Sequence, residues 1–175
     1  FLQKEQPPAD GIYTLCPGIP IRVFAADCLP ILFFSENSDG PIAAVHSGWR
    51  GALNGITSEM VSRLQGLGGD LHAVLGPCLM PCCFEVKTDF IETFEKAGKQ
   101  IGTFLEKKNG GFFFDLPGFV RNTQLFTLRL AAIDQSGLRC TFCSSPRLPS
   151  YRRNHGTDPR IHAWIKKPGV FLGKA

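Results

Sequence analysis

The passage from a buried strand into a helix decides the fold. It reads Pro41-Ile42-Ala43-Ala44-Val45-His46-Ser47-Gly48-Trp49-Arg50-Gly51. The first five residues are apolar without alternation, which is typical of a strand buried inside a sheet. The glycines at 48 and 51 allow a tight turn. Apolar residues then recur at helical spacing, at Leu53, Ile56, Met60, Val61 and Leu64. The stretch therefore predicts a strand that leads directly into a helix.

Apolar runs on both sides of this unit indicate more elements of the same two kinds. Strands are expected at residues 21–26, 29–34, 71–75, 112–114 and 161–165, and helices at 53–64, 89–97 and 119–137. Residues 1–11 are polar and rich in proline, so we expect a loop there. Because helices alternate with buried strands, the pattern favours an α/β sandwich over an all-α or all-β domain.

Composition places the chain among globular proteins. It has 175 residues, of which 43% are hydrophobic and 19% charged, which suits a domain with one core. No apolar run approaches the length of a membrane span, so no membrane partner is expected. The net charge of +4 is spread over scattered Lys and Arg residues. This charge does not favour nucleic-acid binding, but it suits a pocket for a small anion such as phosphate.

The cysteine count bears on the cellular compartment. There are seven cysteines, an odd number that would leave one thiol unpaired in a secreted disulfide framework. A reducing, cytoplasmic location with free thiols is the simpler interpretation. Residues 1–6 contain no initiator Met and no signal-peptide pattern. We therefore expect a processed or trimmed chain.

Two residues at strand ends are the main candidates for chemistry. Cys28 follows the strand expected at 21–26, and His46 ends the strand expected at 41–46. Taken singly, a cysteine in apolar surroundings is usually inert packing. If the two strands are neighbours, however, a thiolate and an imidazole meet at one end of the sheet. Such a pair suits either a zinc site or a nucleophile and its base, and the spacing does not decide between them.

Arginines follow both halves of the predicted site. Arg50 comes directly after the turn at Gly48, beside the predicted start of a helix. Arg152 and Arg153 are adjacent and expected in or before a strand, so that one would face the cleft and the other solvent. His155 and His162 are expected to be ordinary surface or packing residues.

The remaining cysteine motifs are interpreted as structural. Cys78, Cys82 and Cys83 lie close together in sequence, without a following Cys or His pair at zinc-finger spacing. Cys140 and Cys143 form a CxxC that has no second CxxC partner, which excludes a full zinc ribbon. We therefore expect a structured loop at the cleft wall and no second metal site.

Taken together, these motifs resemble one family along nearly the whole chain. The residues that carry the resemblance are Ala26-Asp27-Cys28, Val45-His46-Ser47-Gly48-Trp49-Arg50-Gly51, Gly76-Pro77, Cys82-Cys83-Phe84-Glu85-Val86, Phe114-Asp115-Leu116, Cys140-Thr141 and Ser150-Tyr151-Arg152-Arg153. The chain is similar to the YfiH/laccase-domain proteins, also called multicopper polyphenol oxidoreductase laccase-like proteins. The combined set of motifs is far more specific than any one of them.

The resemblance implies a four-layer α/β/β/α sandwich with mixed sheets, as in deamidating cysteine-hydrolase-like toxins. It also implies one zinc or copper ion bound by His, Cys and His, with Cys28 and His46 as two of the ligands. Ser47 stands where the family has Ala. The family's first His precedes its Ala-Asp-Cys motif, and no His precedes His46 here. Residues 1–175 are accordingly expected to form a single domain of this family that lacks its N-terminal part.

The activities that the resemblance implies are phosphorolysis of adenosine, inosine or methylthioadenosine and deamination of adenosine. Laccase-like oxidation and peptidoglycan editing have also been associated with the family. Two His and one Cys would leave the fourth zinc position open for a water, which is the catalytic arrangement. Arg50, with Arg152 or Arg153, would clamp phosphate, and Asp27 would orient a ligand or a proton. The expected partners are thus a purine nucleoside and phosphate.

Three other functions stay open at this point. The first is a metal-free hydrolase or deamidase with Cys28 as nucleophile and His46 as base. The second is a binding module without catalysis. The third, a laccase-like copper oxidoreductase, is disfavoured because an oxygen-reducing copper cluster needs several imidazoles and the chain has four histidines in all.

Overall fold

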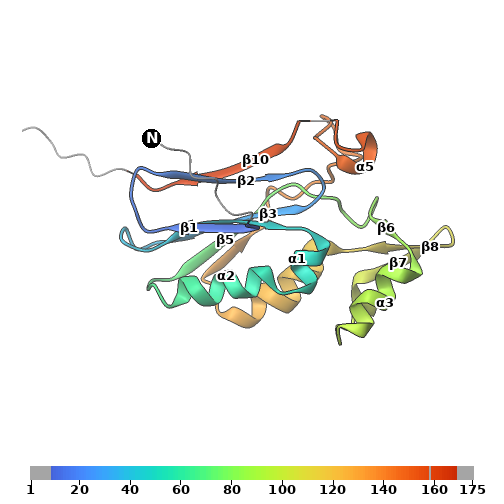
Figure 1. Cartoon of the computed structure of the whole chain (residues 1–175), viewed down its shortest axis with the longest axis horizontal. Coiled ribbons are helices and arrows are strands. Elements are labelled where there is room, and N and C mark those ends of the chain that lie inside the picture. Colours follow the sequence, from blue (N-terminus) through green and yellow to red (C-terminus); the bar gives the residue numbers. More distant parts are fainter. Residues whose placement is uncertain (1–8, 158, 169–175) are drawn as a thin grey trace, which may run out of the picture.

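A central five-stranded sheet organises the molecule (Figure 1). The computed structural model describes residues 9–157 and 159–168. In spatial order the strands are β1 (Gly11–Thr14), β4 (Ile42–Ser47), β3 (Leu29–Ser35), β5 (Leu71–Leu75) and β9 (Ala132–Asp134). Neighbouring strands are antiparallel except for the parallel pair β5–β9. The predicted mixed α/β fold is thereby confirmed.

Both faces of this sheet are covered. One face carries a second sheet of β2 (Pro20–Ala25) and β10 (Ile161–Lys166), paired antiparallel. The other face carries α1 (Trp49–Leu53), α2 (Ile56–Gln65) and the helical segment formed by α4 (Leu116–Val120), η2 (Arg121–Leu125) and η3 (Phe126–Leu128). Burial on both faces explains why β3 and β4 consist mostly of consecutive apolar residues instead of alternating apolar and polar ones.

The main sheet separates two hydrophobic cores, one on each face, and the side chains of β3 contribute to both. Ile31 and Phe33 are fully buried on the helix side of the sheet. Leu32 and Phe34 pack instead against the second sheet, where they contact a cluster that includes Val23. Successive residues of a strand point to opposite faces, so one apolar run serves both cores.

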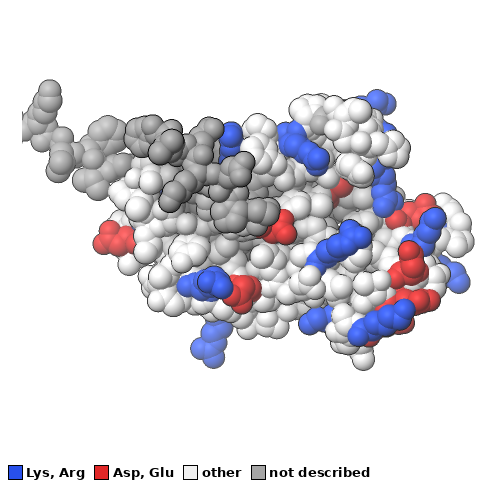
Figure 2. Space-filling model, in the orientation of Figure 1, with Lys and Arg blue, Asp and Glu red and all other residues white. Residues whose placement is uncertain are grey.

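A third sheet extends from one end of the molecule. It contains β6 (Glu85–Val86), β8 (Gly111–Phe114) and β7 (Leu105–Lys108), and it is accompanied by α3 (Thr88–Lys96) and η1 (Gly102–Phe104). Aromatic rings join this part to the main core, with Trp49–Phe90 centroids 5.0 Å apart and Phe94–Phe119 centroids 5.4 Å apart. Acidic and basic side chains are interspersed over the exposed side of α3 (Figure 2).

Two sequence-based predictions of secondary structure were wrong. The helix expected at 119–137 ends at Leu128, because Arg129 adopts a left-handed conformation (φ 46°). Ile133 belongs to β9 instead, and Phe126 is 62% exposed, so these two residues do not share a buried helical face. Arg152 and Arg153 lie in the short helix α5 (Tyr151–Asn154), so the argument that they face opposite sides of a strand does not apply.

The layers can be compared with the expected four-layer sandwich. The described residues form a helical layer, the five-stranded sheet and the two-stranded sheet. A second full helical layer is not seen within residues 9–157 and 159–168. None of the described helices is long and apolar enough to cross a membrane.

Candidate functional site

The side chains of Cys28 and His46 meet at one end of the main sheet. β3 and β4 are paired with Leu29 opposite Ser47, which places Cys28 opposite Gly48. A Cβ atom at Gly48 would lie 2.9 Å from the Cys28 Sγ and 3.8 Å from the His46 Cε1. The absent side chain of Gly48 thus leaves the space in which the thiol and the imidazole converge.

Asp10 fixes the orientation of the His46 ring. Its Oδ1 lies 2.9 Å from the His46 Nδ1, and its carbonyl oxygen accepts a hydrogen bond from the His46 amide at 2.7 Å. A carboxylate that accepts from Nδ1–H leaves the lone pair on Nε2, where a metal ion or a proton is bound. The sequence analysis missed Asp10, because this residue precedes the short edge strand β1 and belongs to no periodic pattern.

Asp27 ties three segments together beside Cys28. Its Oδ1 accepts from the Thr141 hydroxyl at 2.6 Å, and its Oδ2 accepts from the Arg152 amide at 2.6 Å. Its carbonyl oxygen accepts from the Leu79 amide at 2.8 Å. The residue itself has a φ of 81°, a left-handed conformation that is uncommon for a non-glycine residue. Asp27 therefore positions the walls of the site, with both carboxylate oxygens engaged.

A cavity of about 660 Å³ opens at this end of the sheet. This volume lies within the range of small-molecule sites. Carboxylates, arginines and flat aromatic rings line it together. The lining includes Asp10, Asp27, Cys28, His46, Trp49, Arg50, Leu79, Phe84, Leu116, Tyr151, Arg152, His155 and Arg160. The cavity thus combines side chains that can ligate a metal cation, guanidinium groups that can bind an anion, and an apolar surface for a planar group.

Stacking and hydrogen bonds hold two of the expected arginines at the cavity. The Arg50 guanidinium lies over the Trp49 ring, 4.2 Å from its centroid. The Arg152 guanidinium lies 5.3 Å from the centroid of Phe84, and its Nη1 donates to the Glu85 carbonyl at 2.8 Å. Both side chains are therefore presented to the cavity on aromatic supports.

Arg153 is directed elsewhere. Its Nη1 donates to the Phe142 carbonyl at 2.9 Å, its Nη2 donates to the Leu148 carbonyl, and it is not among the cavity-lining residues. Arg160 lines the cavity instead, and so does His155, which the sequence analysis treated as an ordinary residue. Both lie in irregular chain near α5, where no periodic pattern could single them out.

The surroundings of Cys28 disfavour an isolated thiolate. Burial, together with the carboxylates of Asp27 and Asp10, raises the pKa of this thiol to about 11, and Arg160 only partly opposes them. The thiol is therefore protonated near neutral pH unless a cation is bound beside it. A sulfur, an imidazole and nearby carboxylates are a donor set that fits a divalent metal ion.

A second group of sulfur atoms lies outside the cavity lining. The Sγ atoms of Cys82, Cys83, Cys140 and Cys143 all lie within 4.8 Å of one another, so that they could hold a metal ion. The sequence analysis interpreted the two motifs one at a time, as structural and without a second metal site, and did not predict that they lie together. The two motifs are far apart in sequence, and only the tertiary fold brings them together.

The sequence of the chain is similar to those of known proteins over most of its length. A family model described as "Multi-copper polyphenol oxidoreductase laccase" matches residues 2–167. A protein of Aquifex aeolicus named purine nucleoside phosphorylase is 34% identical over 159 residues, covering 88% of this chain and 70% of its own length. YlmD of Geobacillus stearothermophilus, named in the same way, is 29% identical over 169 residues, covering 91% of this chain and 60% of its own length.

Solved structures agree with the sequence matches. A Neisseria meningitidis protein superposes with a TM-score of 0.78 at 28% identity, over 92% of this chain and 65% of that protein. The structure of YlmD gives a TM-score of 0.78 at 27% identity, over 93% of this chain and 62% of that protein. The chain thus spans 60% to 70% of the length of these relatives.

Proposed function

The chain belongs to the multi-copper polyphenol oxidoreductase laccase family, and from this premise we propose that its cavity binds a purine nucleoside and phosphate for phosphorolysis. One observation carries the proposal. Cys28, His46 and three arginines line a single cavity that also has an aromatic wall. Adenosine, inosine and methylthioadenosine are the proposed nucleosides. Deamination of adenosine, in which water adds at C6 and ammonia leaves, is proposed as a second reaction of the same cavity.

Cys28 and His46 would be two ligands of a zinc ion, with copper as the alternative metal. The fit rests on the convergence of both side chains at Gly48 and on the Asp10 carboxylate behind His46. The family's remaining ligand is a histidine that precedes the Ala-Asp-Cys motif, and residues 1–45 contain no histidine. When bound, zinc would supply a Lewis acid and lower the pKa of a coordinated water.

Arg50, Arg152 and Arg160 are the proposed phosphate-binding residues. In phosphorolysis a phosphate oxygen forms a bond to C1′ of the ribose, the glycosidic C–N bond breaks, and the purine base leaves. Guanidinium groups can hold the attacking dianion in a fixed, two-point geometry. Arg153 is proposed to act differently, because it binds main-chain oxygens and thereby positions α5.

The aromatic wall is the proposed site for the base. Trp49, Phe84 and Tyr151 line the cavity together with Leu79 and Leu116. A purine is flat and largely apolar on its faces, so rings of this kind can stack on it while its edges remain available for hydrogen bonds. Arg50 and Arg152, which lie over the Trp49 and Phe84 rings, would then hold the phosphate beside the sugar of the stacked nucleoside.

A multicopper oxidase mechanism is not part of the proposal. Of the four histidines in the chain, only His46 and His155 line the cavity. His72 stacks on Phe34, with ring centroids 4.8 Å apart. His162 packs edge-on against Phe24 at 4.7 Å. The two remaining imidazoles therefore lie elsewhere in the fold.

The proposal is tested by substitution of Cys28. We expect Cys28→Ala to lower the zinc content per chain and to abolish the phosphate-dependent conversion of inosine to hypoxanthine, measured by chromatography. Cys16→Ala is the matched control, because Cys16 is an exposed thiol that does not line the cavity. Unchanged zinc content and unchanged inosine cleavage in the Cys28 variant would reject the site.

A further inference from the structure

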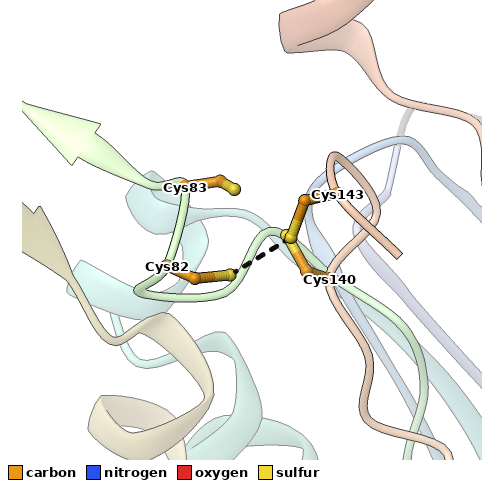
Figure 3. A group of neighbouring side chains, drawn as sticks. All are labelled: Cys82, Cys83, Cys140 and Cys143. Carbon is orange, nitrogen blue, oxygen red and sulfur yellow. Dashed lines mark hydrogen bonds between the residues drawn. The ribbon is translucent and has the colours of Figure 1, made fainter. Parts of the chain in front are cut away.

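Four cysteines from two separate loops point their side chains toward one another (Figure 3). Cys82 and Cys83 belong to the loop between β5 and β6, and Cys140 and Cys143 to the loop that follows β9. The Cys82 and Cys143 sulfur atoms are 3.6 Å apart, and all four sulfurs lie within 4.8 Å of one another. None of these residues lines the cavity of the proposed function.

The sulfur spacing is close to that of a tetrahedral metal site. Zinc–sulfur bonds of about 2.3 Å in a tetrahedron place neighbouring sulfurs about 3.8 Å apart. The cluster needs only small side-chain adjustments to reach this geometry. Cys140 is buried while Cys82 and Cys143 are exposed, so that the group is anchored on one side and open to an entering ion on the other.

We propose that Cys82, Cys83, Cys140 and Cys143 bind one zinc ion as a structural site. Four thiolates are a ligand set that selects zinc among the common divalent ions and fills all four positions. With its coordination complete, the ion has no open position for water or substrate. This site is therefore independent of the proposed nucleoside chemistry, and it does not rest on that proposal.

The backbone holds the two loops side by side before any metal binds. The Cys78 amide donates to the Arg139 carbonyl at 3.2 Å, and the Thr141 amide donates to the Cys78 carbonyl at 3.0 Å. This short parallel bridge aligns Cys78 with Cys140. The sulfur atoms consequently converge from a preformed scaffold, which reduces the conformational entropy that metal binding must remove.

The proposed zinc site is linked to the cavity, because Cys83 directly precedes Phe84, which lines the cavity. The Arg152 Nη1 donates to the Glu85 carbonyl at 2.8 Å, just after the first cysteine pair. The Arg153 Nη1 donates to the Phe142 carbonyl at 2.9 Å, between Cys140 and Cys143. The strand that follows the first cysteine pair and the loop of the second pair thus provide carbonyl oxygens that hold α5. A metal ion that locks the loops together stabilises the position of that helix.

The test uses the Cys28→Ala variant, so that the cavity cannot contribute sulfur to the signal. The variant is supplied with zinc chloride under reducing conditions, dialysed, and measured by elemental analysis and by X-ray absorption at the zinc edge. We expect about one zinc ion per chain with four sulfur neighbours at about 2.3 Å. Adding Cys82→Ser or Cys143→Ser should remove most of this zinc, whereas adding Cys16→Ser should leave it in place.

Three results would overturn the proposal. The first is a folded Cys28→Ala chain that retains no zinc while all its thiols remain titratable. The second is zinc whose neighbours are nitrogen or oxygen. The third is a Cys82–Cys143 disulfide detected by mass spectrometry in protein kept under reducing conditions. The absorption spectrum of the Cys28→Ala chain decides the matter even if a serine variant fails to fold. Failure here leaves the nucleoside proposal untouched, because that proposal is tested by inosine cleavage.

Discussion

Gly48 is the single residue on which the meeting of Cys28 and His46 depends most directly. A Cβ atom at this position would lie 2.9 Å from the Cys28 Sγ, closer than such atoms approach in proteins. Gly48→Ala is therefore expected to push the sulfur out of its place and to lower kcat/KM for phosphorolysis by on the order of 100-fold, the cost of a small misplacement of reacting groups.

Gly102→Ala is the matched control for this substitution. A Cβ atom at Gly102 would meet nothing within 4 Å, so zinc content and turnover should be unchanged. Both variants are compared by elemental analysis and by steady-state kinetics with inosine and phosphate. Full activity of the Gly48 variant would show that turnover does not depend on the present position of the Cys28 sulfur.

The protonation of Cys28 separates a metal site from a metal-free Cys–His dyad. Burial and the carboxylates of Asp27 and Asp10 raise the pKa of this thiol to about 11, whereas the pKa of an unstructured cysteine is about 8.5. In metal-depleted protein, alkylation of Cys28 by iodoacetamide should therefore be slow at neutral pH and accelerate only above pH 10. A cysteine peptide alkylated in parallel provides the reference rate.

The same shift has a consequence for stability. Because the folded-state pKa is raised, the neutral thiol contributes to the free energy of unfolding below about pH 8.5, and this contribution is lost as the pH rises toward 11. The metal-depleted chain should thus lose stability over this alkaline window in urea titrations, and Cys28→Ala should flatten the loss. Rapid, stoichiometric alkylation at pH 7 would instead support the dyad.

At the scale of elements, the sequence predicted best the strands whose two faces are both buried. The strands expected at 29–34 and 41–46 match β3 and β4 within a residue or two, because unbroken apolar runs admit few other placements. The end of the helical segment near Leu128 could not be predicted, since Arg129 takes up its left-handed conformation without a glycine to signal it. Parallel pairing of β9 with β5 is a tertiary effect that leaves no local pattern.

The site was predictable to the extent that its residues sit at strand ends. Cys28 and His46 follow or end buried strands, and register then brings them together. Asp10, His155 and Arg160 lie outside regular strands and helices, so no periodic pattern assigned them to the cavity. The four-cysteine cluster was missed for a related reason. Its cysteines come as one adjacent pair and one CxxC, separated by several elements of the fold.

The short helix α5 offers a test of how one element supports the site. Ser150 is fully buried, and its side chain accepts a hydrogen bond from the Arg153 amide at 3.3 Å, capping the helix. Loss of such a cap costs about 1 kcal/mol of folding free energy. Ser150→Ala should lower stability by this amount and raise the KM for phosphate, because Arg152 moves with the helix.

Ser38→Ala is the control for that substitution, since Ser38 lies in the exposed turn between β3 and β4. Stability is measured by urea denaturation, and KM is measured at saturating inosine. If stability falls without any change in KM, α5 does not set the position of an arginine that binds phosphate, contrary to the proposal. If neither quantity changes, the hydrogen bond from Arg153 contributes little to the helix.

At the scale of the whole molecule, the cavity is assembled from segments that span most of the described chain, from Asp10 to Arg160. A ligand bound there contacts the ends of the main sheet, α1, the loop before β6 and α5 at once. Binding should therefore stabilise the entire fold against unfolding, not one loop. At a ligand concentration 100 times Kd the gain is about 2.7 kcal/mol, which raises Tm by roughly 5 to 10 °C for a chain of this size.

Inosine supplied without phosphate is the ligand for this measurement, because the proposed phosphorolysis cannot then consume it. We expect differential scanning calorimetry to show a clear rise in Tm with inosine and a much smaller rise with uridine, whose single ring offers less area to Trp49, Phe84 and Tyr151. Equal shifts with both nucleosides would mean that the aromatic wall does not select the base. The absence of any shift at millimolar inosine would remove nucleoside binding from this cavity, whatever metal Cys28 and His46 hold.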